Sequence, residues 1–218
     1  MLMPVIPYAT RWPEDFRRIA EALRSAFGPA ALRIDHIGST SVEGLAAKSI
    51  IDIQVTVEVL EAVSEVSSRV VAAGFIHRAE IDRDRPPPWE ADTFAEWRKA
   101  YFRTVDGAPV RAHLHVREHA RRNQRYALLF RDYLRANPRA REAYGKFKLQ
   151  LSEVVGHLSQ PGGTGPYLDL KDPMLDLIAD AAETWAASHG WEISAKNRGL
   201  IEDERSRFTA GAISRGGS

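Results

Sequence analysis

The sequence predicts an α/β (or α+β) fold, in which a small mixed β-sheet carries packed helices and is followed by a helical subdomain. Three observations predict it. Residues 50–57 are β-branched at most positions, which is typical of a strand. Residues 16–27 and 59–73 carry apolar residues at helical spacing. After residue 118 the periodic segments all have helical spacing, so the chain changes from mixed to helical structure.

The first half of the chain alternates helices and strands. Pro13 suits the first turn of the first helix, and Gly28 with Pro29 ends that helix. Asp106-Gly107 is typical of a hairpin turn between two strands. Residues 83–90 contain charges and three consecutive prolines, which predicts a mobile loop near the mouth of the site. The expected strands span residues 32–37, 50–57, 75–77, 97–105 and 110–116.

The second half predicts helices over residues 121–136 and around residues 144–154. A glycine-rich loop then leads to a last helix, for which Asp172 is placed as the N-cap and Pro173 as the first residue. Gly190 lies just past the end of that helix. The chain is therefore divided into a core over residues 1–118, a helical subdomain packed on it over residues 119–196, and a tail over residues 197–218 that is expected to be disordered.

Composition excludes several classes of site and partner. Of the 218 residues, 44% are hydrophobic and 27% charged, as in an ordinary globular protein. With 30 basic and 29 acidic residues, the net charge of +1 provides no overall field for nucleic acid or an anionic membrane. The absence of cysteine excludes disulfides, zinc–thiolate sites and thiol nucleophiles. No signal peptide or membrane-spanning apolar run is recognised, so a cytoplasmic protein is expected.

The candidate chemistry lies in residues 36–55, where a Gly-Ser turn, a loop of small residues and a lysine precede a strand with a carboxylate. Gly38 lets the backbone approach a ligand closely. The hydroxyl residues Ser39, Thr40 and Ser41, with the amides around them, can form an anion nest for phosphate. Lys48 lies in the same loop and can neutralise phosphate charge. Because Gly-Ser-Thr alone more often marks a plain turn, the interpretation depends on the combination and its order.

The strand over residues 50–57 has two different faces. By alternation, its aliphatic buried face comprises Ile51, Ile53, Val55 and Val57. Asp52 and Gln54 lie on the opposite face. A carboxylate in an otherwise apolar strand is costly unless it has a partner such as a metal ion or a lysine. Asp52 is therefore the first candidate for a functional residue.

The stretch resembles the signature of the GrpB family, in which His-Ile-Gly-Ser-Thr is followed by Gly-Leu-Ala-Ala-Lys and Ile-Asp-Ile. Residues 111–116 resemble the family's His-Leu-His-Val strand, and residues 130–135 its Phe-Arg-Asp-Tyr-Leu-Arg helix. Later matching positions are Tyr144, Lys148, Tyr167 and Lys171, and the resemblance extends to Trp185. Since the family is placed in the nucleotidyltransferase superfamily, the resemblance implies a nucleotidyltransferase-like core over residues 1–118.

The chain departs from the superfamily pattern at one position. Gln54 stands where a second carboxylate is expected, and an amide oxygen brings no charge to a two-metal site. Where the superfamily has a third carboxylate on a later strand, this chain offers His113 and His115, which share a face with Arg111. Histidine can bind Mn²⁺ or phosphate, or act as a general base. The alternative is that the two histidines are only the polar face of a strand.

The function expected for this site is transfer of a nucleotidyl group from ATP or another nucleoside triphosphate to a small-molecule acceptor, with Mg²⁺ or Mn²⁺. The expected catalytic residues are Asp52, Lys48, His113 and His115. The expected metal ligands are Asp52, Gln54 and His115. The nucleotide is expected to contact Gly38, Ser39, Thr40, Ser41, Lys48, Arg111, Arg131 and Lys148.

Three alternatives stay open. A non-catalytic nucleotide- or anion-binding module is favoured by Gln54 and by the missing third carboxylate. A phosphotransferase on the same site is chemically close. An RNA-directed transferase is suggested by the arginines between residues 117 and 141, although a net charge near zero argues against it. Neither the acceptor nor the oligomeric state follows from the sequence.

Overall fold

The structure is a computed structural model that describes residues 3–91, 93–158 and 165–193. The elements in chain order are β1 (Val5–Ile6), α1 (Trp12–Phe27), η1 (Gly28–Ala30), β2 (Arg33–Ile37), η2 (Ser39–Ser41), β3 (Ala47–Lys48), β4 (Ile51–Val57), α2 (Ala62–Ala72), β5 (Phe75–His77), α3 (Phe94–Trp97), β6 (Ala100–Thr104), β7 (Ala112–Glu118), α4 (Arg122–Ala136), α5 (Pro138–Leu158) and α6 (Gly165–His189), where η marks a 3₁₀ helix. The mixed α/β class predicted from the sequence is confirmed.

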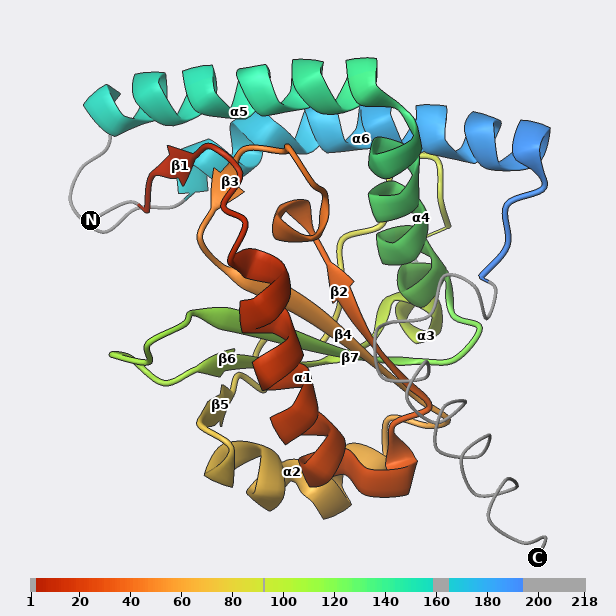
Figure 1. Ribbon diagram of the computed structural model, residues 1–218. Helices are drawn as coiled ribbons and strands as arrows, with labels where there is room; N and C mark the ends of the chain where they lie inside the picture. Colours follow the sequence, from red (N-terminus) through yellow and green to blue (C-terminus); the bar gives the residue numbers. More distant parts are fainter. Residues whose placement is uncertain (1–2, 92, 159–164, 194–218) are drawn as a thin grey trace, which may run out of the picture.

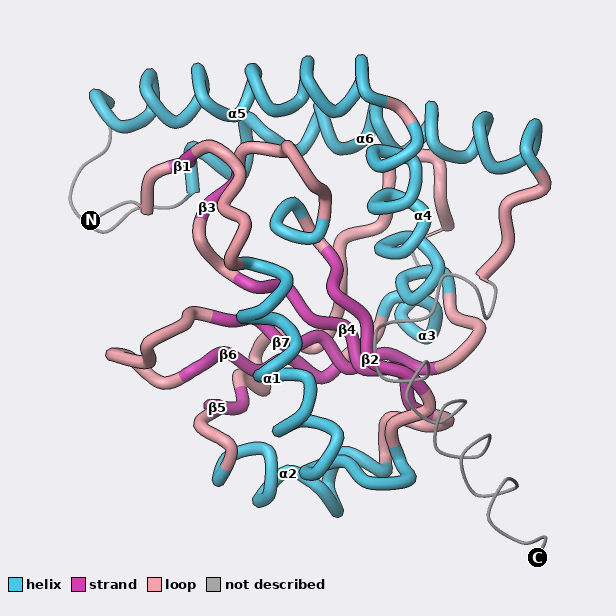
Figure 2. Tube along the Cα trace, in the orientation of Figure 1, coloured by secondary structure: helices cyan, strands magenta, loops and turns pink. Residues whose placement is uncertain are grey.

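A five-stranded mixed sheet forms the centre of the molecule, in the order β2-β4-β7-β6-β5 (Figure 2). β4 and β7 run parallel, whereas the other neighbouring pairs in this sheet are antiparallel. The parallel register places His113 opposite Asp52 and His115 opposite Gln54. The three residue types that sequence analysis singled out on β4 and β7 therefore meet in the middle of the sheet.

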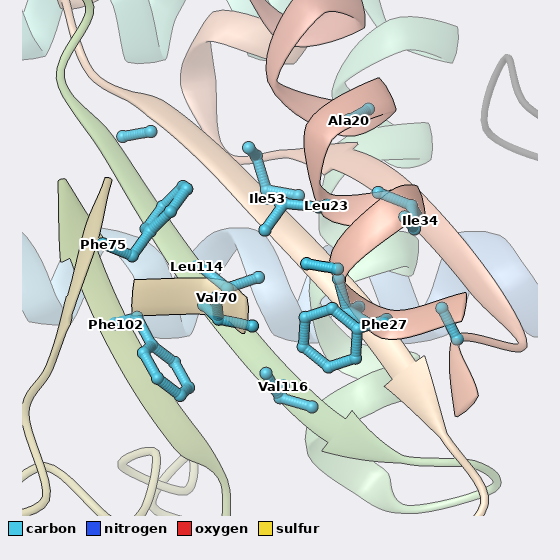
Figure 3. Packing of buried hydrophobic residues seen from close by; sticks show 14 of the residues in the cluster. Ala20, Leu23, Phe27, Ile34, Ile53, Val70, Phe75, Phe102, Leu114 and Val116 are labelled. Carbon is cyan, nitrogen blue, oxygen red and sulfur yellow. The ribbon is translucent and has the colours of Figure 1, made fainter. Parts of the chain in front are cut away.

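One face of the sheet is covered by α1 and α2 and contains the main hydrophobic core (Figure 3). Phe27 and Leu23 of α1 and Val70 of α2 pack against aliphatic side chains of the central strands. Ile51, Ile53, Val55 and Val57 all belong to this core, which confirms the alternation predicted for the strand. The residues of β4 between them must therefore face the opposite side.

The opposite face of the sheet lies toward α4 and α6. Figure 1 shows α5 and α6 side by side at the top of the view, with α4 descending from them beside the sheet. The backbone carbonyl of Gln124 on α4 accepts a hydrogen bond from Gln54 of β4, at 3.2 Å. Over the described residues, the structure has no helix with both the length and the apolar character needed to cross a membrane.

Two local predictions were wrong. α6 begins at Gly165, so Asp172 is no N-cap and Pro173 lies inside the helix. Residues Met174 and Leu175, directly after the proline, pack against the cluster around Leu134 and Tyr144. This packing explains why the helix continues through Pro173, because burial of apolar side chains can outweigh a local backbone preference. The tail over residues 197–218 lies outside the described residues.

The loop over residues 83–90 is tied down by charges rather than left without contacts. The Asp84 carboxylate accepts hydrogen bonds from Arg117 at 2.8 and 3.0 Å and from Lys99 at 2.6 Å. Arg85 donates to both carboxylate oxygens of Asp176 on α6, at 3.0 and 2.8 Å. The loop thus forms ion pairs with both β7 and α6. The charged residues that suggested a mobile loop in the sequence hold it in place.

Candidate functional site

The Gly-Ser turn lies directly against Asp52. Gly38 has φ 68°, a backbone conformation that side chains of L-residues rarely adopt. A Cβ atom at this position would lie 2.4 Å from Oδ2 of Asp52. Gly38 is therefore required twice, once by its dihedral angle and once by the carboxylate packed against it. The side chain of Ser39, the next residue, borders the same space.

The other hydroxyl groups of the turn are used within the turn itself. Ser41 donates to the carbonyl of Gly38 at 2.6 Å, and Thr40 donates to the carbonyl of Ile50 at 3.2 Å. Thr40 Oγ1 also lies 3.0 Å from Nε2 of His36, and burial lowers the pKa of that histidine to about 3. These contacts shape the turn, so Ser39 is the hydroxyl residue best placed to meet a ligand.

Two arginines of α4 donate hydrogen bonds to backbone carbonyls at the two ends of the turn. Arg131 is buried, and its guanidinium donates to the carbonyl of His36 at 3.1 Å and to Asp132 at 2.7 Å. Arg135 donates twice to the carbonyl of Ser41, at 3.1 and 2.7 Å. The expectation that Arg131 contacts the nucleotide therefore needs correction, because its donors are committed to the protein. Both arginines position the turn.

His113 and His115 project from β7 toward Asp52. Nδ1 of His113 lies 3.4 Å from Oδ1 of Asp52, and Nε2 of His115 lies 4.0 Å from the same atom. Burial alone would raise the pKa of Asp52, but the hydrogen bond from His113 and the electrostatic attraction to His113, His115 and Lys171 outweigh it and lower the pKa. Asp52 is thus held as a carboxylate at neutral pH.

His115 is held in its neutral form. Burial and the charges of Arg117 and Lys99 lower its pKa well below 6.5. Arg117 and Lys99 both face its Nδ1, at 3.3 and 3.4 Å. Because both neighbours are donors, Nδ1 must accept, and the ring proton is on Nε2, directed toward Asp52. His115 is therefore suited to donate a hydrogen bond rather than to bind a metal ion.

Gln54 is part of a buried polar network. Its Oε1 accepts from Arg117 at 2.6 Å, and its Nε2 donates to the carbonyl of Gln124 at 3.2 Å. The side chain is fully buried. The expectation that Gln54 is a metal ligand is therefore corrected, because its one acceptor atom already faces a guanidinium.

On one side of Asp52 lies a cavity of about 360 Å³, which we call the lysine chamber. Its lining includes Ser39, Asp52, His113, Lys48, Lys148 and Lys171. Lys148 of α5 is buried, and its ammonium lies 4.4 Å from the centroid of the Tyr144 ring. Burial and the charge of Lys171 lower the pKa of Lys148 to about 7, although Asp52 acts in the opposite direction. The chamber therefore concentrates positive charge.

On the other side of Asp52 lies a second cavity, of about 330 Å³, which we call the aromatic chamber. Its lining includes Trp97, Tyr126, Phe130, His115, Arg117 and Asp84. Tyr126 lies beside Trp97 and Phe130, with ring centroids 6.2 and 6.1 Å away. Ser39, Asp52, Tyr144 and Lys171 line both chambers. Asp52 is one of these shared residues, so the two chambers adjoin there and form one cleft.

A metal centre of the superfamily type does not fit these residues. In the described parts of the chain, no three His, Asp or Glu side chains are grouped so that they could hold a metal ion. Among the described residues, Asp52 is the single carboxylate that lines the lysine chamber, and the cations around it would repel a divalent ion. The expected role of Asp52, Gln54 and His115 as a metal site, with Mg²⁺ or Mn²⁺, is not supported by this set of donor atoms.

The structure brings together most of the residues that the sequence predicted. Asp52, Lys48, Lys148 and His113 meet in the lysine chamber with Ser39. Arg111 lies elsewhere: it is exposed ahead of β7, and its guanidinium points to the sulfur of Met3 at 3.8 Å. Lys171, Asp84 and Arg117 belong to the cleft but were not predicted as site residues. Only the resemblance of Lys171 to a family position could have indicated it.

Comparison with known proteins gives one family. The family model described as GrpB protein matches residues 3–181. A crystal structure of the conserved protein GrpB from Enterococcus faecalis superposes with a TM-score of 0.65 at 31% identity, covering 83% of this chain and 99% of that chain. The confirmed resemblance thus extends over the whole cleft, from the Gly-Ser turn to Lys171.

Two of the curated relatives are longer than this chain. A Mycobacterium tuberculosis protein named dephospho-CoA kinase is 37% identical over 201 residues, which cover 86% of this chain and 47% of the relative. The UPF0157 protein YqkA of Bacillus subtilis is 33% identical over 181 residues, covering 83% of this chain and 47% of the relative. The chain therefore spans about half the length of these relatives.

Proposed function

The chain belongs to the GrpB family, and we propose that it transfers a nucleotidyl group from ATP or another nucleoside triphosphate to a small-molecule acceptor. The observation that carries the proposal is the division of the cleft at Asp52 into a cationic and an aromatic chamber. A nucleoside triphosphate has the same division, with an anionic phosphate chain at one end and a flat aromatic base at the other. Its α-phosphate would then lie beside Asp52.

Each chamber suits its part of the nucleotide by a separate physical effect. In the lysine chamber, ammonium groups in a partly dehydrated space interact strongly with phosphate oxygens. The backbone after Gly38 and the hydroxyl of Ser39 border the same space. In the aromatic chamber, the partly exposed rings of Tyr126 and Phe130 offer stacking surfaces for a base, and the buried ring of Trp97 lies beside Tyr126.

In the proposed reaction, His113 activates the acceptor. Its Nδ1 faces Asp52, so that nitrogen carries the proton donated to the carboxylate and Nε2 keeps its lone pair. About a third of the side chain is exposed. Nε2 accepts the proton of a hydroxyl group on the acceptor, while the oxygen of that hydroxyl bonds to the α-phosphorus. The bond from the α-phosphorus to the bridging oxygen breaks, and pyrophosphate leaves with its negative charge beside the lysines.

We do not propose a dephospho-CoA kinase activity, the activity in the name of the mycobacterial relative, for this chain. Less than half of that relative is matched. The sequence also contains no Gly-x-x-x-x-Gly-Lys followed by Ser or Thr, the loop with which P-loop kinases hold phosphates. A phosphoryl transfer from the same cleft would move the γ-phosphate instead of the α-phosphate, so labelled ATP distinguishes the two reactions.

The test uses ATP labelled at the α- or the γ-phosphate with a panel of small-molecule hydroxyl and amine acceptors. We expect the α-label to appear on an acceptor, with one pyrophosphate released for each transfer. Asp52→Asn keeps the shape but removes the charge that orients His113, so the rate should fall at least about a hundredfold. Asp106→Asn, on the exposed hairpin, is the matched control and should leave the rate unchanged. Transfer of the γ-label, or an Asp52→Asn variant as fast as wild type, would reject the proposal.

A further inference from the structure

Lys148 is a buried lysine that has no hydrogen-bond partner among the described residues. Only 3% of the residue is exposed, and within the described residues no acceptor lies within hydrogen-bond distance of its Nζ. A lysine buried in this way destabilises the folded chain unless a ligand provides the missing partner. Its contact with the ring of Tyr144 offsets part of that cost. The ammonium borders the lysine chamber, so an anion there could complete its contacts.

Two further lysines from separate elements border the same chamber. Lys48 belongs to β3 and Lys171 to α6, and the charge of Lys171 lowers the pKa of both Lys48 and Lys148. Because the three lysines line one cavity, their like charges disfavour the protonation of one another. Of the described residues, Asp52 is the one carboxylate that lines this chamber with the three lysines.

We propose that Lys148, with Lys48 and Lys171, binds the phosphate chain of the substrate directly, so that this binding needs no divalent cation. The inference rests on the proposed function for the identity of the substrate. The lysines would perform the charge neutralisation that metal ions perform where two carboxylates hold them. The proposal also explains why Gln54 can replace a carboxylate. If the lysines bind the phosphates, no second metal ligand is needed at position 54, and its oxygen can accept a hydrogen bond from Arg117 instead.

The effect of Mg²⁺ on ligand binding distinguishes a site made of lysines from a site that needs a metal ion. A tripolyphosphate anion carries several negative charges on oxygens that can each accept a hydrogen bond from an ammonium. Mg²⁺ would compete with the lysines for those oxygens, so adding Mg²⁺ should leave the affinity unchanged or lower it. A site that needs a metal ion would show the reverse, because its lysines alone could not hold the ligand.

The experiment is calorimetry with inorganic tripolyphosphate on the full chain, in EDTA and in excess Mg²⁺. Wild type should bind in EDTA, and Lys148→Met should weaken binding at least about tenfold, since a buried charge contact to the ligand is lost. Lys171→Met should weaken it similarly. Lys146→Met, on an exposed position of the same helix, is the matched control and should bind like wild type. Circular dichroism establishes that each variant is folded.

Binding that appears only when Mg²⁺ is added would overturn the proposal. So would a folded Lys148→Met variant that binds like wild type, or a Lys146→Met variant that loses as much affinity. The two proposals fail separately. Tripolyphosphate binding in EDTA without any α-label transfer would reject the function and leave the phosphate site. Transfer together with Mg²⁺-dependent tripolyphosphate binding would reject the phosphate site and leave the function.

Discussion

Replacing Lys148 by methionine should stabilise the folded chain. Methionine has a similar length and flexibility but no charge, so it can occupy the same space beside Tyr144. Lys148 has an ordinary pKa of 10.5 in the unfolded chain and a pKa of about 7 in the folded chain, chiefly because of burial and then the charge of Lys171. The folded state therefore disfavours the protonated form, and the substitution removes this disadvantage.

The sign and the pH window follow from these two values. Below about pH 7 the lysine is protonated in both states, and the destabilisation is complete, at about 5 kcal/mol or less. Between about pH 7 and 10.5 the folded state is neutral while the unfolded state still binds a proton, so the destabilisation shrinks as pH rises. It vanishes above 10.5, where both states are neutral.

Urea denaturation at about pH 6 and pH 9.5 measures this difference. We expect Lys148→Met to raise the free energy of unfolding by several kcal/mol at the lower pH and by about 1 kcal/mol at the higher one. Lys146→Met, which is exposed, should change it by less than about 0.5 kcal/mol at either pH. A Lys148→Met variant that is less stable than wild type, or a gain that does not depend on pH, would refute the reasoning.

Three further changes test separate parts of the site. Gly38→Ala should destabilise the chain by more than Gly107→Ala, because both glycines have positive φ but only the first places a Cβ against Asp52; equal losses of unfolding free energy would contradict the close approach. Gln54→Glu should leave Mn²⁺ binding unchanged in calorimetry, since Arg117 faces the oxygen at position 54. Tighter Mn²⁺ binding by this variant would contradict that expectation and support position 54 as a metal ligand. The affinity for tripolyphosphate should fall as the pH rises through about 7, where Lys148 loses its proton in the free protein, and titrations at several pH values should show a smaller fall in Lys148→Met than in wild type.

The sequence predicted well what depends on short-range pattern. Alternation along β4 placed Asp52 and Gln54 opposite the aliphatic face, and the same rule placed His113 and His115 together on β7. The contact of Gly38 with Asp52 was not predicted; it follows from the antiparallel register that pairs Ile37 with Asp52. These relations follow from the two-residue period of a strand and from chain connectivity.

What the sequence could not show depends on contacts between distant segments. Arg131 and Lys148 are both basic residues on helices, yet one donates to the backbone of the turn and the other borders the chamber. Helical periodicity does not distinguish these two directions. Asp84 lies in a loop whose composition suggested mobility, and its partner Arg117 comes 33 residues later. Gln54 was assigned to a metal because its neighbour in space, Arg117, could not be identified from the sequence.

The proposed function requires that the cleft around Asp52 holds a nucleoside triphosphate. A crystal structure of the chain with α,β-methylene-ATP, prepared in EDTA, would show whether it does. We expect the β- and γ-phosphates within hydrogen-bond distance of Lys148 and Lys171, the α-phosphorus beside Asp52, and the base against Tyr126 and Phe130. A nucleotide bound outside the cleft, or one in the cleft with its phosphates turned away from the lysines, would contradict it.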